Sequence, residues 1–174
     1  MGGVLSLRTD KTQGSTASFD FIAKQPDKTS KKLLENASQD NIMKVIKGLK
    51  VLYAEDKIIN QKVISLMLSH AKINVALANN GAEALDMMSK DKFDIILLDM
   101  IMPVMDGMET VQAIRQQFES SPPLIGVTAN TMEKSKKQYL DNGLDDIITK
   151  PVNPAELYQK IAHWHLQKSK KKMI

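Results

Sequence analysis

From residue 50 onward, short apolar runs alternate with longer segments in which apolar residues recur every three or four positions. Short runs rich in branched aliphatic residues are typical of buried strands, and the longer spacing is typical of helices. The predicted strands are residues 51–54, 73–78, 93–98, 124–127 and 146–149. The predicted helices are residues 58–71, 82–89, 107–118, 131–140 and 154–166.

Residues that favour helix starts lie at the expected boundaries. Asp106 suits the N-cap of the third helix, and Pro154 suits the first turn of the fifth. Strict alternation of strands and helices predicts a parallel sheet covered on both faces, because right-handed crossovers place the helices there. We predict an α/β fold, a flavodoxin-like (βα)5 three-layer sandwich with a five-stranded parallel sheet in the order 2-1-3-4-5.

Polar residues follow four of the predicted strands. Glu55 and Asp56 follow the first strand, Asp99 the third, Thr128 the fourth and Lys150 the fifth. The carboxyl ends of parallel strands share one edge of the sheet, so these side chains should meet in one shallow cleft. Asp99 is the most informative, because four apolar residues precede it and a carboxylate rarely lies beside a core without a partner or a use.

Three carboxylates in one cleft repel one another and require a cation. Oxygen ligands without histidine or cysteine favour a hard divalent ion, and we predict Mg²⁺. With a hydroxyl and a lysine nearby, such a site suits phosphoryl transfer, and an aspartate can itself become an acyl phosphate. The pattern therefore predicts phosphoryl chemistry centred on Asp99.

The segments that carry these residues resemble the motifs of response regulator receiver domains, the CheY-like domains of two-component signalling. The matching segments are YAED at 53–56, LLDMIMPVMDG at 97–107, VTAN at 127–130 and TKP at 149–151. This resemblance implies that Asp99 accepts a phosphoryl group from a phosphohistidine and relays it to a partner. The implied partners are a sensor histidine kinase and a histidine phosphotransfer domain.

The resemblance also implies a ligand set for Mg²⁺. Asp56 and Asp99 would bind the ion directly, and Glu55 would assist through water. The backbone carbonyl of Ile101 would complete the protein ligands.

On the phosphate side, the resemblance implies that Thr128 bonds a phosphoryl oxygen and that Lys150 pairs with the phosphate. The bond between Lys150 and Pro151 resembles the cis peptide of the family, which would aim the lysine inward.

Two positions depart from the common pattern of the family. Ile147 stands where receivers usually carry an aromatic switch residue, so output by rotation of a ring is not expected here. Ile101, two residues past Asp99, has an apolar side chain that can neither orient an attacking water nor donate to it. We therefore predict that phosphorylated Asp99 hydrolyses slowly, which suits relay to a histidine phosphotransfer partner.

Four further segments indicate the subclass. Residues 55–61 and 102–107 resemble receivers at the C-terminus of hybrid sensor histidine kinases, and residues 1–7 and 14–21 resemble the final hairpin of a kinase ATPase domain. No segment resembles the phosphorylated-histidine helix or the ATP lid. We expect the chain to catalyse its own aspartyl phosphorylation and dephosphorylation, without ATP-dependent kinase activity.

The expected organisation has four parts. Residues 1–23 are a remnant of a histidine kinase ATPase domain, 24–48 a linker, 49–167 the receiver domain and 168–174 a basic tail. A short helix within residues 33–47 and a disordered linker both remain compatible with the sequence.

The net charge of +4 is unevenly distributed. Residues 1–49 hold 8 basic and 5 acidic residues, 167–174 hold 4 lysines, and 50–166 hold 12 basic and 15 acidic residues. A nucleic-acid-binding core would show the reverse, so we expect no nucleic-acid contact through this domain. There is no cysteine and no apolar run of the roughly 20 residues that a membrane helix needs. We expect a cytoplasmic domain without membrane insertion, whether or not a parent kinase is membrane-anchored.

Two other functions compete with the phosphoacceptor reading. A phosphorylation-independent receiver-fold interaction module would not need the acidic residues, Thr128 and Lys150 that this chain retains. An unrelated Mg²⁺-dependent phosphohydrolase would require a second acidic residue beside the nucleophile and a cap segment that covers the substrate. Neither is recognisable in the sequence.

Overall fold

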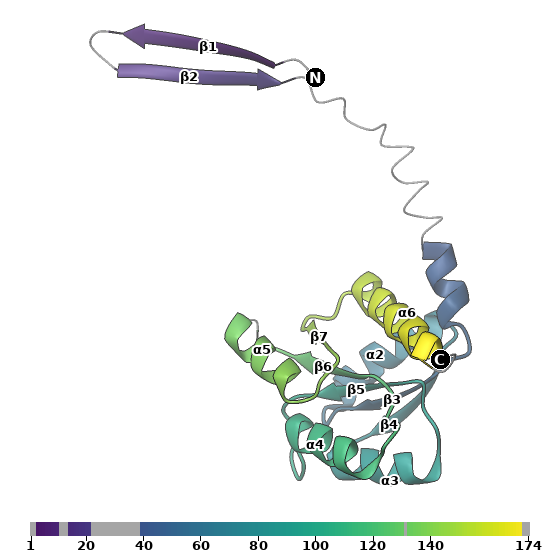
Figure 1. Ribbon diagram of the computed structural model, residues 1–174. Coiled ribbons are helices and arrows are strands. Elements are labelled where there is room, and N and C mark those ends of the chain that lie inside the picture. Colours follow the sequence, from purple (N-terminus) through teal and green to yellow (C-terminus); the bar gives the residue numbers. More distant parts are fainter. Residues whose placement is uncertain (1–2, 11–13, 22–38, 131, 172–174) are drawn as a thin grey trace. The chain divides into compact units, whose positions relative to one another are not determined.

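The computed structural model describes the backbone of residues 3–10, 14–21, 39–130 and 132–171 (Figure 1). The chain divides into two compact units, Met1–Ser38 and Gln39–Ile174. In the first unit, β1 (Gly3–Asp10) pairs antiparallel with β2 (Gly14–Phe21). This pairing agrees with the hairpin expected for the region, and its origin in a kinase domain stays a prediction.

The second unit is built on a five-stranded parallel sheet in the order β4-β3-β5-β6-β7. This order is the predicted 2-1-3-4-5 arrangement, counted within the unit. The strands are β3 (Lys50–Ala54), β4 (Asn74–Ala78), β5 (Ile95–Asp99), β6 (Leu124–Thr128) and β7 (Asp146–Thr149). The helices between and after them are α2 (Ile58–His70), α3 (Gly81–Lys90), α4 (Gly107–Gln117), α5 (Glu133–Asp141) and α6 (Pro154–Lys171).

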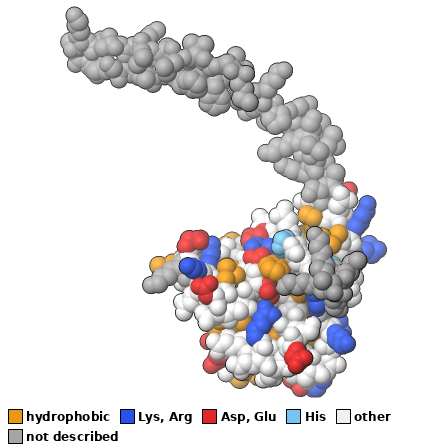
Figure 2. Space-filling view, viewed as in Figure 1, with side chains coloured by type: hydrophobic (Ala, Val, Ile, Leu, Met, Phe, Trp, Pro, Cys, Tyr) orange, Lys and Arg blue, Asp and Glu red, His pale blue; other side chains and the backbone are white. Residues whose placement is uncertain are grey.

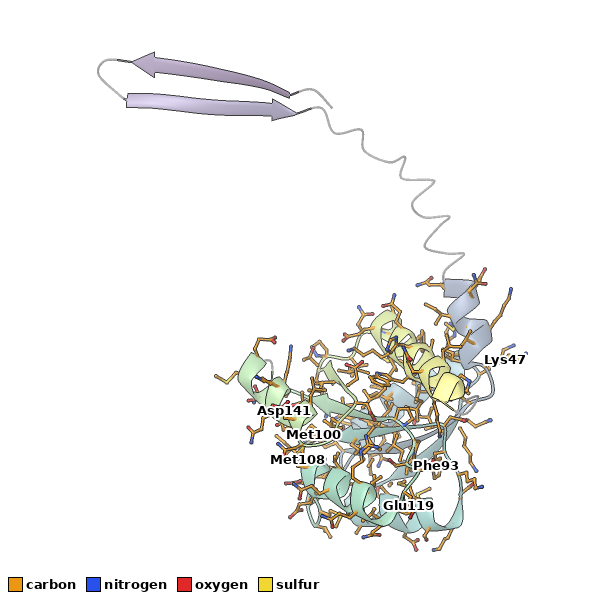
Figure 3. All side chains as sticks on the ribbon, in the orientation of Figure 1. Lys47, Phe93, Met100, Met108, Glu119 and Asp141 are labelled. Atoms are coloured by element: carbon orange, nitrogen blue, oxygen red, sulfur yellow. The ribbon has the colours of Figure 1, made fainter. Side chains whose placement is uncertain are left out.

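The helices cover both faces of the sheet and enclose two apolar clusters. Val51 and Tyr53 of β3 pack with α2 and α6 on one face. Leu52 and Ala54, which alternate with them, pack with α3 and α4 on the other, together with Met100 (Figure 3). Every residue of β5 and β6 is buried, as expected for central strands with both faces covered. The predicted three-layer sandwich is therefore confirmed.

Helix ends follow local sequence chemistry. Asp106 caps α4 through a reciprocal pair of bonds with Glu109, in which each side chain accepts from the backbone N–H of the other. Pro154 opens α6 as predicted, but this helix continues to Lys171 rather than ending near residue 166. The lysines and glutamine of this stretch are good helix formers, which explains the longer helix.

Residues 39–46 are helical and belong to the second unit. Ile46 is fully buried and Leu49 nearly so, and both join the cluster on the α2 and α6 face. Within the described residues, the linker stretch therefore forms the short helix left open by the sequence, while residues 33–38 lie outside them. Across the part of the chain described here, no helix combines the length and apolar character needed to cross a membrane.

Charged side chains of both signs are interspersed over the face of the second unit in view (Figure 2). Asp146, the first residue of β7, is half-buried and pairs with α6. Its Oδ1 accepts from Lys160 Nζ at 2.5 Å and its Oδ2 from Trp164 Nε1 at 3.0 Å, which ties β7 to α6. Burial alone would raise the pKa of Asp146, but these hydrogen bonds outweigh it and hold the pKa below its ordinary value.

We expect Asp146→Asn to lower the free energy of unfolding at pH 7 by about 1–3 kcal/mol, because Lys160 would lose its nearer charged partner and keep only Glu156, 3.9 Å away. A depressed folded-state pKa means that this stabilisation is complete above the unfolded value of about 3.9 and is lost as the pH falls through the folded value. In urea titrations, the difference in free energy of unfolding between the parent and Asp146→Asn should therefore become smaller in acid.

The control for Asp146→Asn is Asp86→Asn, because Asp86 also pairs with a lysine but is 61% exposed. Ion pairs that are this exposed contribute little to the free energy of unfolding, so the control substitution should change it by no more than about 0.5 kcal/mol. An Asp146→Asn variant as stable as the parent at pH 7 would show that the tie between β7 and α6 is energetically neutral.

Candidate functional site

The carboxyl ends of the strands bring the predicted residues to one edge of the sheet. Glu55 and Asp56 follow β3, and Asp99 is the last residue of β5, the neighbour of β3. One carboxylate oxygen from each of these three residues lies within 4.8 Å of the others. The predicted acidic cluster is therefore present.

Lys150 bridges two members of this acidic cluster. Its Nζ lies 2.8 Å from Asp99 Oδ2 and 2.8 Å from Glu55 Oε2. The peptide between Lys150 and Pro151 is cis, as the motif predicted. Burial would lower the pKa of Lys150, but the hydrogen bonds to Asp99 and Glu55 outweigh it and raise the pKa, so the ammonium stays charged.

Thr128 ends β6, the strand next to β5, and is buried. Its carbonyl accepts from the Lys150 backbone N–H at 2.8 Å, which fixes the two residues relative to each other. Its Oγ1 accepts from the Asn130 backbone N–H at 3.1 Å. Accepting that bond does not use the hydroxyl hydrogen, so Thr128 keeps its capacity to donate to a ligand oxygen.

Glu55 is fully buried and accepts several hydrogen bonds. Tyr53 Oη donates to Oε2 at 2.8 Å, and Asn60 Nδ2 donates to Oε1 at 3.0 Å. Burial opposes ionisation of Glu55, but hydrogen bonds from Lys150, Asn60 and Tyr53 outweigh it and lower its pKa to about 2. Burial and the bond to Glu55 raise the pKa of Tyr53, so its hydroxyl remains a donor.

Asp99 is 5% exposed, and the backbone N–H of Ile101 donates to its Oδ1 at 3.4 Å. Burial raises the pKa of Asp99 and the charge of Glu55 adds to this effect, against the opposing effect of Lys150. Ile101 itself turns outward, with 73% of its surface exposed. A cation beside the cluster would favour the ionised form that Asp99 needs to act as a nucleophile.

The donor set fits a hard divalent cation. Three carboxylates lie together and Lys150 pairs with two of them, Glu55 and Asp99, so negative charge remains in excess. Asp56 Oδ1 is buried and has no hydrogen-bond partner among the residues that the structure describes. A buried carboxylate oxygen without a partner is costly, and coordination of a metal would satisfy it.

The loop after Asp99 is held against the sheet by the start of α4. A side chain at Gly107 would place its Cβ 2.6 Å from the carbonyl oxygen of Asp99 and 2.7 Å from Met100 Cα. Both are backbone atoms that cannot give way, so only glycine allows α4 to begin this close to the strand end. The close approach keeps the loop that carries Ile101 beside the cluster.

Sequence reasoning missed the hydrogen-bond donors of Glu55. The sequence places Tyr53 in a strand and Asn60 in a helix and predicts no hydrogen bond from either to Glu55. Strand alternation offered a signal, because side chains two residues apart point to the same side, which places the Tyr53 hydroxyl toward Glu55.

The chain matches the family Response regulator receiver domain over residues 51–162, more than half of its length. Hybrid signal transduction histidine kinase I of Dictyostelium discoideum is 40% identical over 121 residues, 64% of this chain and 7% of that kinase. Autoinducer 2 sensor kinase/phosphatase LuxQ of Vibrio vulnificus is 26% identical over 162 residues, 93% of this chain and 19% of LuxQ. The chain thus spans a small part of these relatives.

Two solved structures share the fold. The receiver domain of sensor histidine kinase PA1611 from Pseudomonas aeruginosa, with magnesium coordinated in its active site cleft, is 33% identical. It superposes with a TM-score of 0.63 over 68% of this chain and 98% of that one. The second is a Saccharomyces cerevisiae co-crystal structure of the histidine phosphotransfer protein Ypd1 and the receiver domain of Ssk1. The match is 30% identical with a TM-score of 0.64, and it covers 71% of this chain and 92% of that one.

Proposed function

Since this chain belongs to the response regulator receiver domain family, we propose that Asp99 accepts a phosphoryl group from a phosphohistidine in a Mg²⁺-dependent reaction. The observation that carries the proposal is the position of Lys150 Nζ, 2.8 Å from Asp99 Oδ2, beside an acidic cluster in which Asp56 Oδ1 has no hydrogen-bond partner among the described residues. A nucleophile, a fixed cation and metal ligands together are what phosphoryl transfer requires.

In the proposed reaction, a bond from an Asp99 oxygen to phosphorus forms as the bond from phosphorus to histidine nitrogen breaks. The bonding electron pair stays on the histidine nitrogen. Lys150 offsets charge on the phosphoryl oxygens, and the Thr128 hydroxyl donates to one of them. Bound Mg²⁺ would neutralise further charge, held by Asp56, Asp99 and the carbonyl of Ile101, with Glu55 acting through water.

We propose a histidine phosphotransfer domain as the partner that takes the phosphoryl group onward. Ile59, Val63 and Leu66 form an exposed apolar row on α2 at the spacing of one helix face, and α2 begins just after Asp56. Ile101 and Val104 add exposed apolar surface in the loop after Asp99. The complex of Ypd1 with the related Ssk1 receiver supports a partner of this class.

We also propose that the chain corresponds to the end of a hybrid sensor histidine kinase. The similarity to LuxQ extends over 162 residues, beyond the span 51–162 of the receiver match. A match confined to the receiver domain would be shorter, so this length supports a kinase origin for the hairpin predicted at 1–23. A cytoplasmic location fits a domain that exchanges phosphate with a kinase.

Acetyl phosphate tests the proposed function without a partner. With Mg²⁺ present, the purified chain should gain the mass of one phosphoryl group, and a chelator should prevent the gain. No gain in mass, with binding to a phosphotransfer protein retained, would favour a phosphorylation-independent interaction module. Continuous turnover of a phosphomonoester would favour a phosphohydrolase.

Ile101 should make the phosphorylated state long-lived. Its apolar side chain offers no polar group to an attacking water, and its backbone N–H is directed to Asp99. We expect Ile101→Asn to speed loss of the phosphoryl group on the order of tenfold, because an amide can orient the water. The decay is followed by intact mass after acetyl phosphate is removed. A parent lifetime of only seconds in Mg²⁺ buffer would contradict the prediction.

A further inference from the structure

Tyr53 is a polar residue buried within an apolar cluster. Its side chain is fully inaccessible and packs with Ile64, Leu68 and other apolar residues between the sheet and α2. Phenylalanine would fill the same space without the cost of burying a hydroxyl. The hydroxyl is not directed to the backbone, but donates to Glu55 Oε2 at 2.8 Å.

Glu55 Oε2 accepts from two donors of different character. Lys150 Nζ lies 2.8 Å away, and the same ammonium also lies 2.8 Å from Asp99 Oδ2. When Asp99 carries a phosphoryl group, Lys150 is needed by the new phosphoryl oxygens. Tyr53 is then the donor that remains on Oε2, while Asn60 and the Lys57 backbone N–H hold Oε1 of the Glu55 carboxylate.

We infer that Tyr53 is a positioning residue for divalent-cation binding, acting through Glu55; this inference rests on the proposed function for its place in the reaction. The hydroxyl fixes the orientation of the Glu55 carboxylate whether or not Lys150 pairs with it. Hydrogen-bond partners of metal ligands commonly orient them and tune the metal site. Tyr53 touches neither the phosphoryl group nor the cation.

The test is Tyr53→Phe, which removes one oxygen and keeps the packing of the ring. We expect the dissociation constant for Mg²⁺, measured by calorimetry without any phosphoryl donor, to rise about tenfold. The rate of phosphorylation by acetyl phosphate at saturating Mg²⁺ should stay within about twofold of the parent, because the hydroxyl acts on metal binding and not on the transferring group.

The matched control is Tyr158→Phe. This tyrosine is also buried, but its hydroxyl donates to the Met67 carbonyl at 2.7 Å, away from the acidic cluster. The same loss of one oxygen there should leave the Mg²⁺ affinity unchanged. Urea unfolding of both variants separates effects on stability from effects on the site.

A Mg²⁺ affinity of Tyr53→Phe within about twofold of the parent would overturn the inference, and so would loss of the fold, which would assign Tyr53 to the core alone. Failure of the proposed function has a different signature. In that case the parent would bind Mg²⁺ and respond to Tyr53→Phe, yet gain no phosphoryl group from any donor.

Discussion

Asp99→Asn is expected to abolish phosphorylation, leaving no detectable gain of mass after incubation with acetyl phosphate or a phosphorylated histidine phosphotransfer domain. The amide oxygen of asparagine is a poor nucleophile, and the amide also weakens a proposed ligand to Mg²⁺. Asp99 is the acidic residue that ends the central strand β5 and contacts Lys150 directly. Loss of this one oxygen nucleophile should therefore remove the reaction entirely rather than slow it.

The loss should not come from unfolding. Three carboxylates lie together in this cluster and one lysine pairs with two of them, so removal of one negative charge relieves repulsion. We expect Asp99→Asn to unfold in urea at the parent midpoint or above it, and Asp86→Asn at an exposed site to phosphorylate normally. A phosphoryl group still gained by folded Asp99→Asn would show that another residue is the acceptor.

The site residues could be found in the sequence because strand ends are simple to locate. Apolar runs followed at once by a polar residue mark Glu55, Asp99 and Thr128, and parallel strands must place such ends together. The family match and the observed sheet order confirm the resemblance and the fold that these motifs predicted.

What the sequence left undetermined depends on three-dimensional packing. Strand alternation places Tyr53 and Glu55 on the same side, but the bond between them also requires a particular ring orientation within the core, which alternation alone does not specify. Likewise, the segment 39–46 is too short to be a stable helix alone, and burial of Ile46, with partial burial of Ile42 and Val45, against the α2 and α6 face stabilises it. Tertiary contacts determine both the Tyr53–Glu55 bond and the helix at 39–46.

Lys150→Met should slow phosphoryl transfer to Asp99 by about 10²–10³-fold, the usual cost of removing one preorganised group that stabilises transition-state charge. Methionine keeps most of the length and volume of lysine but lacks the ammonium that contacts both Asp99 and Glu55. Without that charge, burial and the repulsion from Glu55 would raise the pKa of Asp99 further, leaving less of the nucleophilic carboxylate.

Initial rates with acetyl phosphate over a range of Mg²⁺ concentrations identify the cause of the Lys150→Met defect. If Lys150 acts on the phosphoryl group, the phosphorylation rate of the variant stays below that of the parent at saturating Mg²⁺. If Lys150 only offsets the charge of the acidic cluster, added Mg²⁺ restores the rate, and the role assigned to Lys150 in phosphoryl transfer is wrong. Lys160→Met is the control, because Lys160 is about as exposed as Lys150 but pairs with Asp146, the first residue of β7. It should lose stability while keeping the rate.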